Sequence, residues 1–255
     1  MIRAGLDPIA QFKIYKLAEL KVGKYDLSFT NASFMMLLAV ALIGLWMFFG
    51  TRKHELVPDR AQSFVEVTYE FVAGLVRSSA GADGLKFFPF VFSLFVFILF
   101  ANMLGMIPIF FTTTSHIIVT FALAMMVMAL VVGYGVFKHG FKFLKVFVPS
   151  GIPMAILPFV TLLEIISFLS RPISLSVRLW ANMLAGHILL KLFAGFCIMM
   201  VTGFGLFPGV IGAIIPFGLT FALIPLEFLV AFVQAYVFAL LTSVYLSDAL
   251  HPGHH

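Results

Sequence analysis

Charge and cysteine are both scarce in this sequence. Charged residues make up 11% of its 255 residues, whereas a typical soluble domain would be about a quarter charged. The single cysteine, Cys197, excludes an intrachain disulfide and any metal site built from several cysteines. The sequence also lacks HExxH spacing, a phosphate-binding glycine loop and a nucleophile elbow. We therefore expect no cofactor and no metal.

Apolar residues fill most of the chain. Hydrophobic residues account for 62% of it, with 32 phenylalanines, and several apolar runs exceed the roughly 18 residues that indicate a membrane span. These properties predict a polytopic membrane protein. The formal net charge of +5 does not indicate a nucleic-acid partner, because the lysines and arginines lie in short loops between the expected spans.

The pattern of apolar runs predicts an all-α polytopic membrane protein. We expect about five membrane-embedded helices plus an amphipathic surface helix, on which Phe64, Val67, Phe71 and Leu75 recur at helical spacing. An ordinary cytoplasmic connector helix is the alternative for that segment. The single domain, 1–255, would contain an N-terminal arm (1–30), a first span (31–50), the surface helix (58–80), a helical hairpin (87–137) and a long hairpin (155–248). The helical hairpin would consist of two spans, 87–111 and 117–137.

The last two apolar segments are too long for ordinary spans. Residues 155–200 and 214–246 would each be far longer as helices than the hydrocarbon layer, which is about 30 Å thick. They must be steeply inclined, broken or both, and Pro172, Pro216 and Pro225 are candidate bends. The simplest arrangement is an antiparallel, strongly tilted hairpin.

The distribution of lysine suggests an orientation. Lys138, Lys142 and Lys145 lie in a short loop without acids, which the positive-inside tendency places in the cytoplasm. Alternation then places residues 112–116 and the N-terminus outside. Four lysines in the N-terminal arm disagree with this orientation.

Acidic residues become rare along the chain. Of the 11 acids, eight precede residue 84, and only Glu164, Glu227 and Asp248 follow it. A charge deep in lipid is costly, so each of these requires a reason. Arg178 and Gln234 mark the centres of the two long segments, and counting from these centres compares the depths of the acids.

Two groups of side chains result from this count. Glu164 and Asp248 each lie 14 residues from their centre toward the cytoplasmic side. His187 lies nine residues from its centre, and Glu227 seven, toward the outside. The pattern predicts two proton-capable half-paths separated by a fixed cation, Arg178. Solvated helix ends are the alternative for the two inner acids.

A helical wheel refines this prediction. The residues within about 40° of Arg178 are polar or small, which suits close approach by another helix; they are Glu164, Arg171, Ser174, Asn182 and Ala185. His187 falls on the opposite side, where it would point into a pocket behind this face, toward Glu227.

Several of these residues also have structural interpretations. Arg171 and Lys191 fit snorkelling or structural cations. His187 and Glu227 would also fit a structural pair. His116, in the short outer loop, would be solvated or would serve as a proton entry.

Two stretches carry a resemblance to a known family. SRPISLSVRLWANMLAGHILLK and PLEFLVAFVQAYVFALLTSVYLSDAL resemble the a subunit of the F-type ATP synthase. DPIAQF, near the start, extends the resemblance over nearly the whole chain. SSAGADGLKFFPFVFSLF and the DALHPGHH tail are similar to alphaproteobacterial and mitochondrial members.

The resemblance implies roles at matching positions. Arg178 would face a ring of c subunits. The proton path would comprise Arg178, Asn182 and Gln234 at the ring, His187 and Glu227 in the outer half-channel, and Glu164 and Asp248 in the inner one. The pairing of a histidine at position 187 with an acid at position 227 is similar to that in mitochondrial members.

The resemblance also implies a proton-channel subunit that is not catalytic alone. Its partners would be the c-subunit ring, peripheral-stalk b-type subunits, the remainder of the F1Fo ATP synthase, membrane lipid and protons, with no nucleic acid. It would lie in the bacterial inner (plasma) membrane, or in the mitochondrial inner membrane if organellar. From the residues alone, a stand-alone proton-coupled secondary transporter or channel stays open. An intramembrane enzyme is disfavoured, because the carboxylates are split by depth.

Overall fold

The protein is a bundle of long helices with a small N-terminal hairpin. The computed structural model describes residues 12–19, 21–22, 25–26, 28–52, 58–107, 110–140, 143, 148 and 156–250. Its elements are β1 (Lys16–Ala18), β2 (Lys21–Val22), β3 (Tyr25–Asp26), β4 (Phe29–Thr30), α1 (Asn31–Thr51), α2 (Arg60–Gly84), η3 (Leu85–Phe87), α3 (Phe88–Gly105), η4 (Thr113–Ser115), α4 (Ile117–His139), α5 (Leu157–Phe204) and α6 (Leu206–Leu250). Five helical segments of the described chain are long and apolar enough to cross a membrane. The predicted all-α polytopic class is confirmed.

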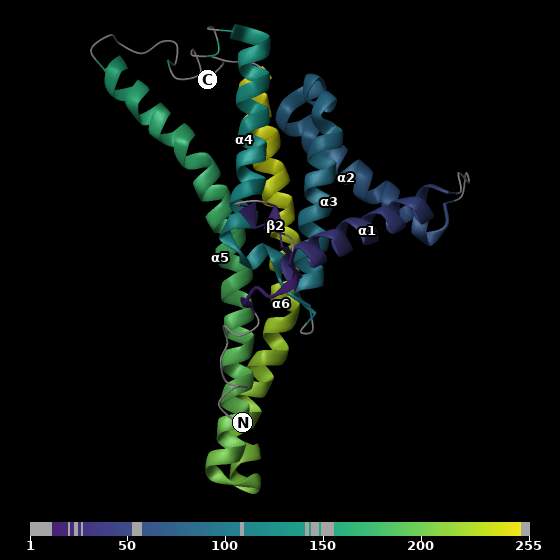
Figure 1. Cartoon of the computed structure of the whole chain (residues 1–255), viewed down its shortest axis with the longest axis vertical. Helices are drawn as coiled ribbons and strands as arrows, with labels where there is room; N and C mark the ends of the chain where they lie inside the picture. Colours follow the sequence, from purple (N-terminus) through teal and green to yellow (C-terminus); the bar gives the residue numbers. More distant parts are fainter. Residues whose placement is uncertain are drawn as a thin grey trace.

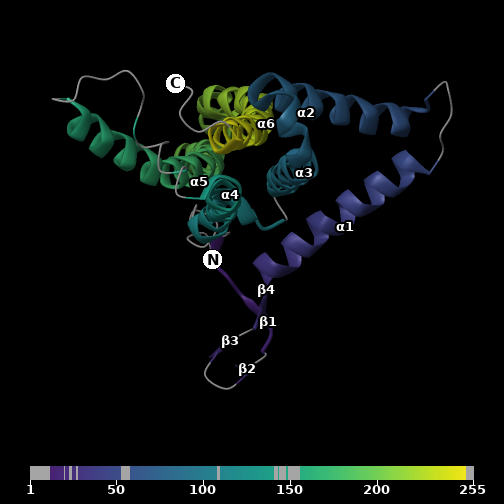
Figure 2. The same ribbon diagram turned by 90° about the horizontal axis from the view of Figure 1, so that it is seen from above.

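The last two helices, α5 and α6, form the predicted antiparallel hairpin (Figure 1). They lie side by side along the lower half of the molecule, and the first turns of α5 angle away from α6 in both views (Figures 1 and 2). Pro172 lies inside α5, and Pro216 and Pro225 lie inside α6.

The turn between these two helices is tighter than the sequence suggested. We expected a connection over residues 201–213, but only Gly205 separates the helices, with φ at 83°. A Cβ at Gly209 would lie 2.5 Å from the carbonyl oxygen of Met200. The expected loop is wrong because two glycines allow the chain to reverse with its backbones in close contact.

The buried core forms where α2 to α6 meet. Its most buried side chains include Val72, Phe95, Val127, Leu179 and Phe238, all at most 2% exposed. On α6, a stripe of small residues faces this core; it consists of Ala231, Ala235 and Ala239. Small residues let neighbouring backbones approach closely, and Asn102 of α3 donates a hydrogen bond to the Ala231 carbonyl oxygen at 3.1 Å.

Helices α1 and α2 form an arm beside this core. α1 runs out from the bundle and α2 returns toward it (Figure 2). α1 closely matches the first span expected over 31–50. α2 extends past the surface helix expected over 58–80, with non-helical geometry at Gly81, where φ is 69°. Of the four residues expected on its apolar face, Phe64, Val67 and Phe71 are exposed, whereas Leu75 is buried in the core.

The helical hairpin expected over 87–137 has a long connection. α3 ends at Gly105 instead of at Phe111, and α4 begins at Ile117 as expected. Part of this connection, Thr112 to Ser115, is buried. The predicted span is too long because the apolar run includes residues that lie beyond the end of α3 and pack against the bundle outside an α-helix.

The N-terminal arm contains two short antiparallel ladders. β1 pairs with β4, and β2 pairs with β3. The hydroxyl of Thr30 then caps α1 by accepting a hydrogen bond from the backbone N–H of Ser33. The expected cytoplasmic loop lies largely outside the described residues, which include Lys138 but not Lys142 or Lys145.

Candidate functional site

One cluster joins the two acids that the sequence placed near the inner face. Nη1 of Arg171 lies 2.7 Å from Oδ2 of Asp248, and Nη2 lies 3.7 Å from Oε1 of Glu164. The guanidinium also lies over the rings of Tyr245 and Phe168, at 4.9 and 5.4 Å from their centroids. Arg171 therefore links acids from α5 and α6, a contact that depth counting alone did not predict.

A second cluster joins His187 and Glu227. Nδ1 of His187 lies 3.6 Å from Oε1 of Glu227, and both side chains are buried. The expected orientation of His187 toward Glu227, away from the exposed Arg178, is present. Gly186 makes room for this pair, because a Cβ there would lie 2.7 Å from Oε1 of Glu227.

The other imidazole nitrogen of His187 contacts the loop between α3 and α4. Nε2 lies 3.1 Å from Oγ1 of Thr112, and the same hydroxyl donates a hydrogen bond to the Gly105 carbonyl oxygen at 3.1 Å. Both oxygens of Glu227 lack a hydrogen-bond partner among the described residues. The imidazole is therefore held from one side and faces an unsatisfied carboxyl group on the other.

The N-terminal arm closes over this second cluster. Phe12 is buried and its ring meets the His187 ring edge-on, with centroids 6.2 Å apart. Lys191 lies over the Phe12 ring at 6.0 Å. A single aromatic side chain from the arm thus contacts the imidazole and a cation one turn beyond it.

His116 is less solvated than its loop position suggested. Its ring stacks on Phe111 with centroids 4.9 Å apart, and its Nε2 atom is buried without a hydrogen-bond partner in the described structure. Burial lowers the pKa of His116 below 6.5, and a backbone hydrogen bond with Phe12 partly opposes that shift. The expectation of a solvated histidine is wrong because the loop folds against the bundle.

His187 and Glu227 each line a cavity. One, of about 390 Å³, is lined by His187, Lys191 and Thr220 among others. The other, of about 160 Å³, is lined by Glu227, Gly186 and Asn182 among others. Leu190 lines both cavities.

Arg178 lies between the two clusters along α5. Its side chain is exposed, and no carboxylate of the described chain forms an ion pair with it. Asn182, one turn on, is half-buried, and Gln234 of α6 is buried. The structure does not bring these two amides into hydrogen bonds with Arg178, which faces outward from the described bundle.

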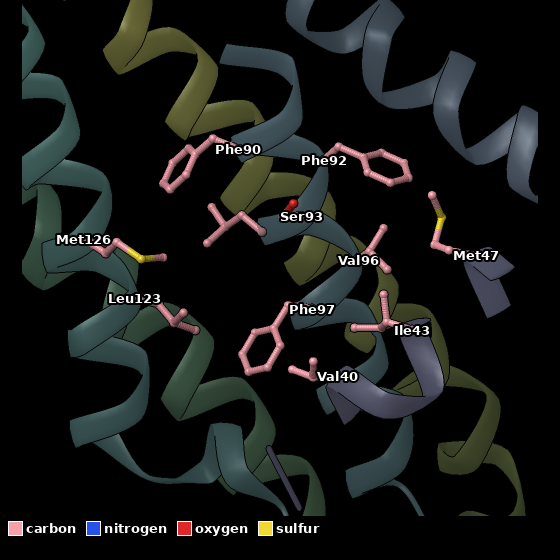
Figure 3. A pocket seen from close by; sticks show the side chains of 11 residues that line it. Val40, Ile43, Met47, Phe90, Phe92, Ser93, Val96, Phe97, Leu123 and Met126 are labelled. Carbon is pink, nitrogen blue, oxygen red and sulfur yellow. The ribbon is translucent and has the colours of Figure 1, made fainter. Parts of the chain in front are cut away.

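A further cavity lies away from both clusters. It has a volume of about 650 Å³, and α1, α3 and α4 line it with apolar side chains and Ser93 (Figure 3). The Ser93 hydroxyl donates to the carbonyl oxygen of Pro89 on its own helix. None of the described residues that line this cavity is titratable, so these residues offer none of the proton chemistry of the two clusters.

Sequence reasoning named Arg171 without predicting its contact with Asp248, and it missed Gly186, Phe12 and Thr112. Arg171 stands seven residues after Glu164, on the same helix face, and this spacing was the available signal. For Gly186, the available signal was a small residue directly before His187. Phe12 and Thr112 left no local signal, because each reaches His187 from a distant part of the chain.

These observations define a multi-pass helical membrane protein whose buried and half-buried acids and bases form two separate clusters. Residues 33–247 match the family ATP synthase A chain, and the chain belongs to that family. The resemblance of the two quoted stretches is thereby confirmed, and the chain is a membrane subunit that is not catalytic alone.

Relatives from alphaproteobacteria match nearly the whole chain. ATP synthase subunit a of Chelativorans sp. (strain BNC1) is 59% identical over 250 residues, which are 97% of this chain and 99% of the relative. The protein of the same name from Bartonella bacilliformis is 58% identical over 97% of this chain and 98% of its own length. That from Rhizobium meliloti (strain 1021) is 58% identical over 98% and 99%.

Proposed function

We propose that this chain is the proton-path stator subunit of the Fo sector in an F-type ATP synthase. Two offset half-channels protonate and deprotonate a carboxylate on a rotating ring of c subunits, and Arg178 separates them. The observation that carries the proposal is the division of titratable groups into two clusters, one before and one after an exposed Arg178 on α5.

The outer half-channel delivers protons to the ring. A proton enters from the outer side, with His116 as the candidate entry residue, passes His187 and Glu227, and neutralises a ring carboxylate. The neutral carboxyl group can rotate into lipid, because desolvation penalises the charged form. The cavity that Glu227 and Asn182 both line supports a connection between the outer cluster and the ring contact.

The inner half-channel receives protons after nearly a full turn of the ring. Glu164 and Asp248 line this exit in the proposal, and Gln234 and Asn182 are polar neighbours of the ring contact. The ion pairs of Arg171 with both acids support a shared polar environment at the inner end. The orientation, with the loop at 138–145 in the cytoplasm, belongs to the same proposal.

The charge and the chemistry of Arg178 both suit a residue that separates two half-channels. A cation about 4 Å from a carboxylate contributes about 4 kcal/mol at an effective dielectric of about 20. One proton crossing about 100 mV releases about 2.3 kcal/mol. The arginine therefore biases the ring carboxylate on the scale of the driving force. Since a guanidinium keeps its proton, it does not pass protons between the half-channels.

The surroundings of the subunit follow from this role. Its partners are the c-subunit ring, peripheral-stalk b-type subunits and the remainder of the F1Fo complex, within the bacterial inner membrane. A stand-alone proton-coupled transporter is the rival. Gentle solubilisation separates the two: co-purification of a small two-helix proteolipid supports the rotary role, whereas a lone chain that transports protons defeats it.

The half-channels are tested by side-specific pH dependence. In membrane vesicles that contain the whole complex, Glu227→Gln should change the dependence of proton-driven ATP synthesis on outer pH, and Asp248→Asn its dependence on inner pH. Asp83→Asn, in an exposed pair with Lys86, serves as the control. If both variants altered only the same side, or neither side, the division into two half-channels would be wrong.

A further inference from the structure

The hydrogen bonds of Thr112 define where the proton of neutral His187 lies. A hydroxyl group has one proton to donate, and a carbonyl oxygen can only accept. Thr112 Oγ1 donates to the Gly105 carbonyl oxygen at 3.1 Å, so at its 3.1 Å contact with His187 Nε2 it must be the acceptor. Neutral His187 therefore carries its proton on Nε2, and its Nδ1 carries the lone pair.

The hydroxyl of Thr112 is fixed in place by its surroundings. Thr112 is 2% exposed, and its backbone carbonyl oxygen accepts a hydrogen bond from the Ser115 hydroxyl at 2.6 Å. Gly105 allows the close approach of this loop, because a Cβ there would lie 2.7 Å from Cγ2 of Thr112. The side chain that faces His187 thus has little freedom to turn its hydroxyl elsewhere.

We infer that Thr112 is a positioning residue that holds neutral His187 in the Nε2–H tautomer, with its Nδ1 lone pair facing Glu227. This role rests on the proposed function, in which His187 and Glu227 carry protons. The 3.6 Å separation between Nδ1 and Oε1 of Glu227 places the basic nitrogen next to the group that is to receive the proton.

The tautomer makes one nitrogen both the acceptor and the donor of the proton. A proton from water on the outer side adds to Nδ1 and forms the imidazolium ion, while the Nε2–H bond to Thr112 is kept. The Nδ1–H bond then breaks, and its proton passes to the carboxylate of Glu227, which becomes neutral. The imidazole returns to its starting tautomer, so the cycle requires no ring flip.

Two charged or titratable groups share the surroundings of His187. Glu227 faces it from α6, and Lys191 lines the same cavity from α5. The loop and the N-terminal arm present Thr112 and Phe12, neither of which titrates at these pH values. Among these contacts, only the Thr112 hydroxyl touches Nε2 of His187. Its loss would therefore remove the contact that favours one tautomer over the other.

The test compares three variants in membrane vesicles that contain the whole complex. Thr112→Val keeps the shape but leaves the Nε2–H group buried without an acceptor, so we expect proton-driven ATP synthesis to slow about tenfold. Its outer-pH profile should move to lower pH, because loss of the acceptor destabilises the charged imidazolium ion more than the neutral ring. Thr112→Ser keeps the hydroxyl and should recover most of the rate.

Thr114→Val is the matched control. Thr114 lies in the same loop and is fully buried, and its hydroxyl has no hydrogen-bond partner among the described residues. This variant should keep the wild-type rate and pH profile. An equal loss in Thr114→Val, or no rescue by Thr112→Ser, would reduce Thr112 to loop packing and overturn the inference.

The experiments distinguish a wrong inference about Thr112 from a wrong proposed function. If Thr112→Val keeps the wild-type rate and profile while Glu227→Gln changes the outer-pH profile, the inference is overturned and the proposed function stands. If Glu227→Gln also leaves the outer-pH profile unchanged, the outer half-channel itself is wrong, and the inference falls with it.

Discussion

Arg171 contacts acids on two different helices, although the sequence allowed it to be a snorkelling cation. The charge of Arg171 is shared between Glu164 and Asp248, and the three side chains are 15%, 29% and 12% exposed. A wheel treats each helix separately, and a depth count compares helices without giving the direction of a side chain. Neither could therefore predict that one guanidinium would link the inner acids.

Removing Arg171 should destabilise the inner cluster. Arg171→Gln leaves two half-buried carboxylates without their cation, at an expected cost of about 1–3 kcal/mol after allowance for solvent screening. The amount of the subunit in the membrane, measured by immunoblot, should fall several-fold. Lys86→Gln removes an exposed pair with Asp83 and is the control. Equal membrane levels in the two variants would contradict a stabilising role for Arg171.

Gly186 provides a residue-scale test of the outer cluster. Gly186→Ala would place a Cβ 2.7 Å from Oε1 of Glu227 and so displace the carboxyl group from His187. A displacement of about 1 Å at a reacting group can slow a step about a hundredfold, and we expect proton-driven ATP synthesis to fall at least tenfold. Gly203→Ala, on the same helix with no atom within 4 Å of its Cβ, should be tolerated. Wild-type rates in Gly186→Ala would show that the pair tolerates displacement.

The pairing of His187 with Glu227 was predictable from the sequence, but the contact of Thr112 with His187 was not. Counting residues from the centres of two antiparallel helices places the two side chains at similar depth, and the wheel turns His187 away from Arg178. Thr112 lies 75 residues earlier in the chain than His187. Its contribution depends on how a non-helical loop packs, which periodicity does not reveal.

At the scale of elements, α5 and α6 depend on the turn between them. Their unusual length was visible as two long apolar segments, and the hairpin followed from that length. The exact position of the turn was not visible, because glycines and a proline are spread over residues 203–212. The turn is set instead by Gly205 and Gly209, through backbone conformation and close contact.

Of the two glycines in that turn, Gly209 should be the more sensitive to substitution. Gly209→Ala places a Cβ 2.5 Å from the Met200 carbonyl oxygen and 2.6 Å from the Val201 Cα, so the backbone must move. Overpacking of this kind costs about 1–3 kcal/mol. We expect faster proteolysis of the subunit in membranes and a several-fold lower steady-state level.

Gly218→Ala is the control for this prediction. Gly218 also lies on α6, but no atom lies within 4 Å of a Cβ built there. The two substitutions share the same change of side chain and the same helix. If both variants were equally resistant to protease, the close contact at the hairpin turn would not matter for stability.

At the scale of the whole molecule, the described bundle leaves most of its apolar surface exposed. In the most apolar window of α5, and likewise of α6, only 6% of residues are buried within the chain. Composition therefore predicted the membrane class directly. It could not predict how α1 and α2 project from the bundle, or the apolar cavity between α1, α3 and α4 (Figures 2 and 3), because an apolar face packs equally well against lipid or protein.

The molecule contains two clusters of titratable groups, with one exposed cation, Arg178, between them on α5. Each cluster includes side chains from both long helices, so the hairpin holds them at separate positions. Arg178, exposed and without an ion pair in the described chain, is available to a carboxylate of another subunit. The function proposed for the assembly depends on that availability.

The most direct measurement is ATP-driven proton pumping by membranes that carry Arg178→Ala. The account predicts that pumping is lost, while ATP hydrolysis by the detached catalytic sector continues at the wild-type rate. Immunoblots of the membranes must show that the subunit is still present. Normal proton pumping by Arg178→Ala membranes would contradict the central claim that this arginine separates two half-channels.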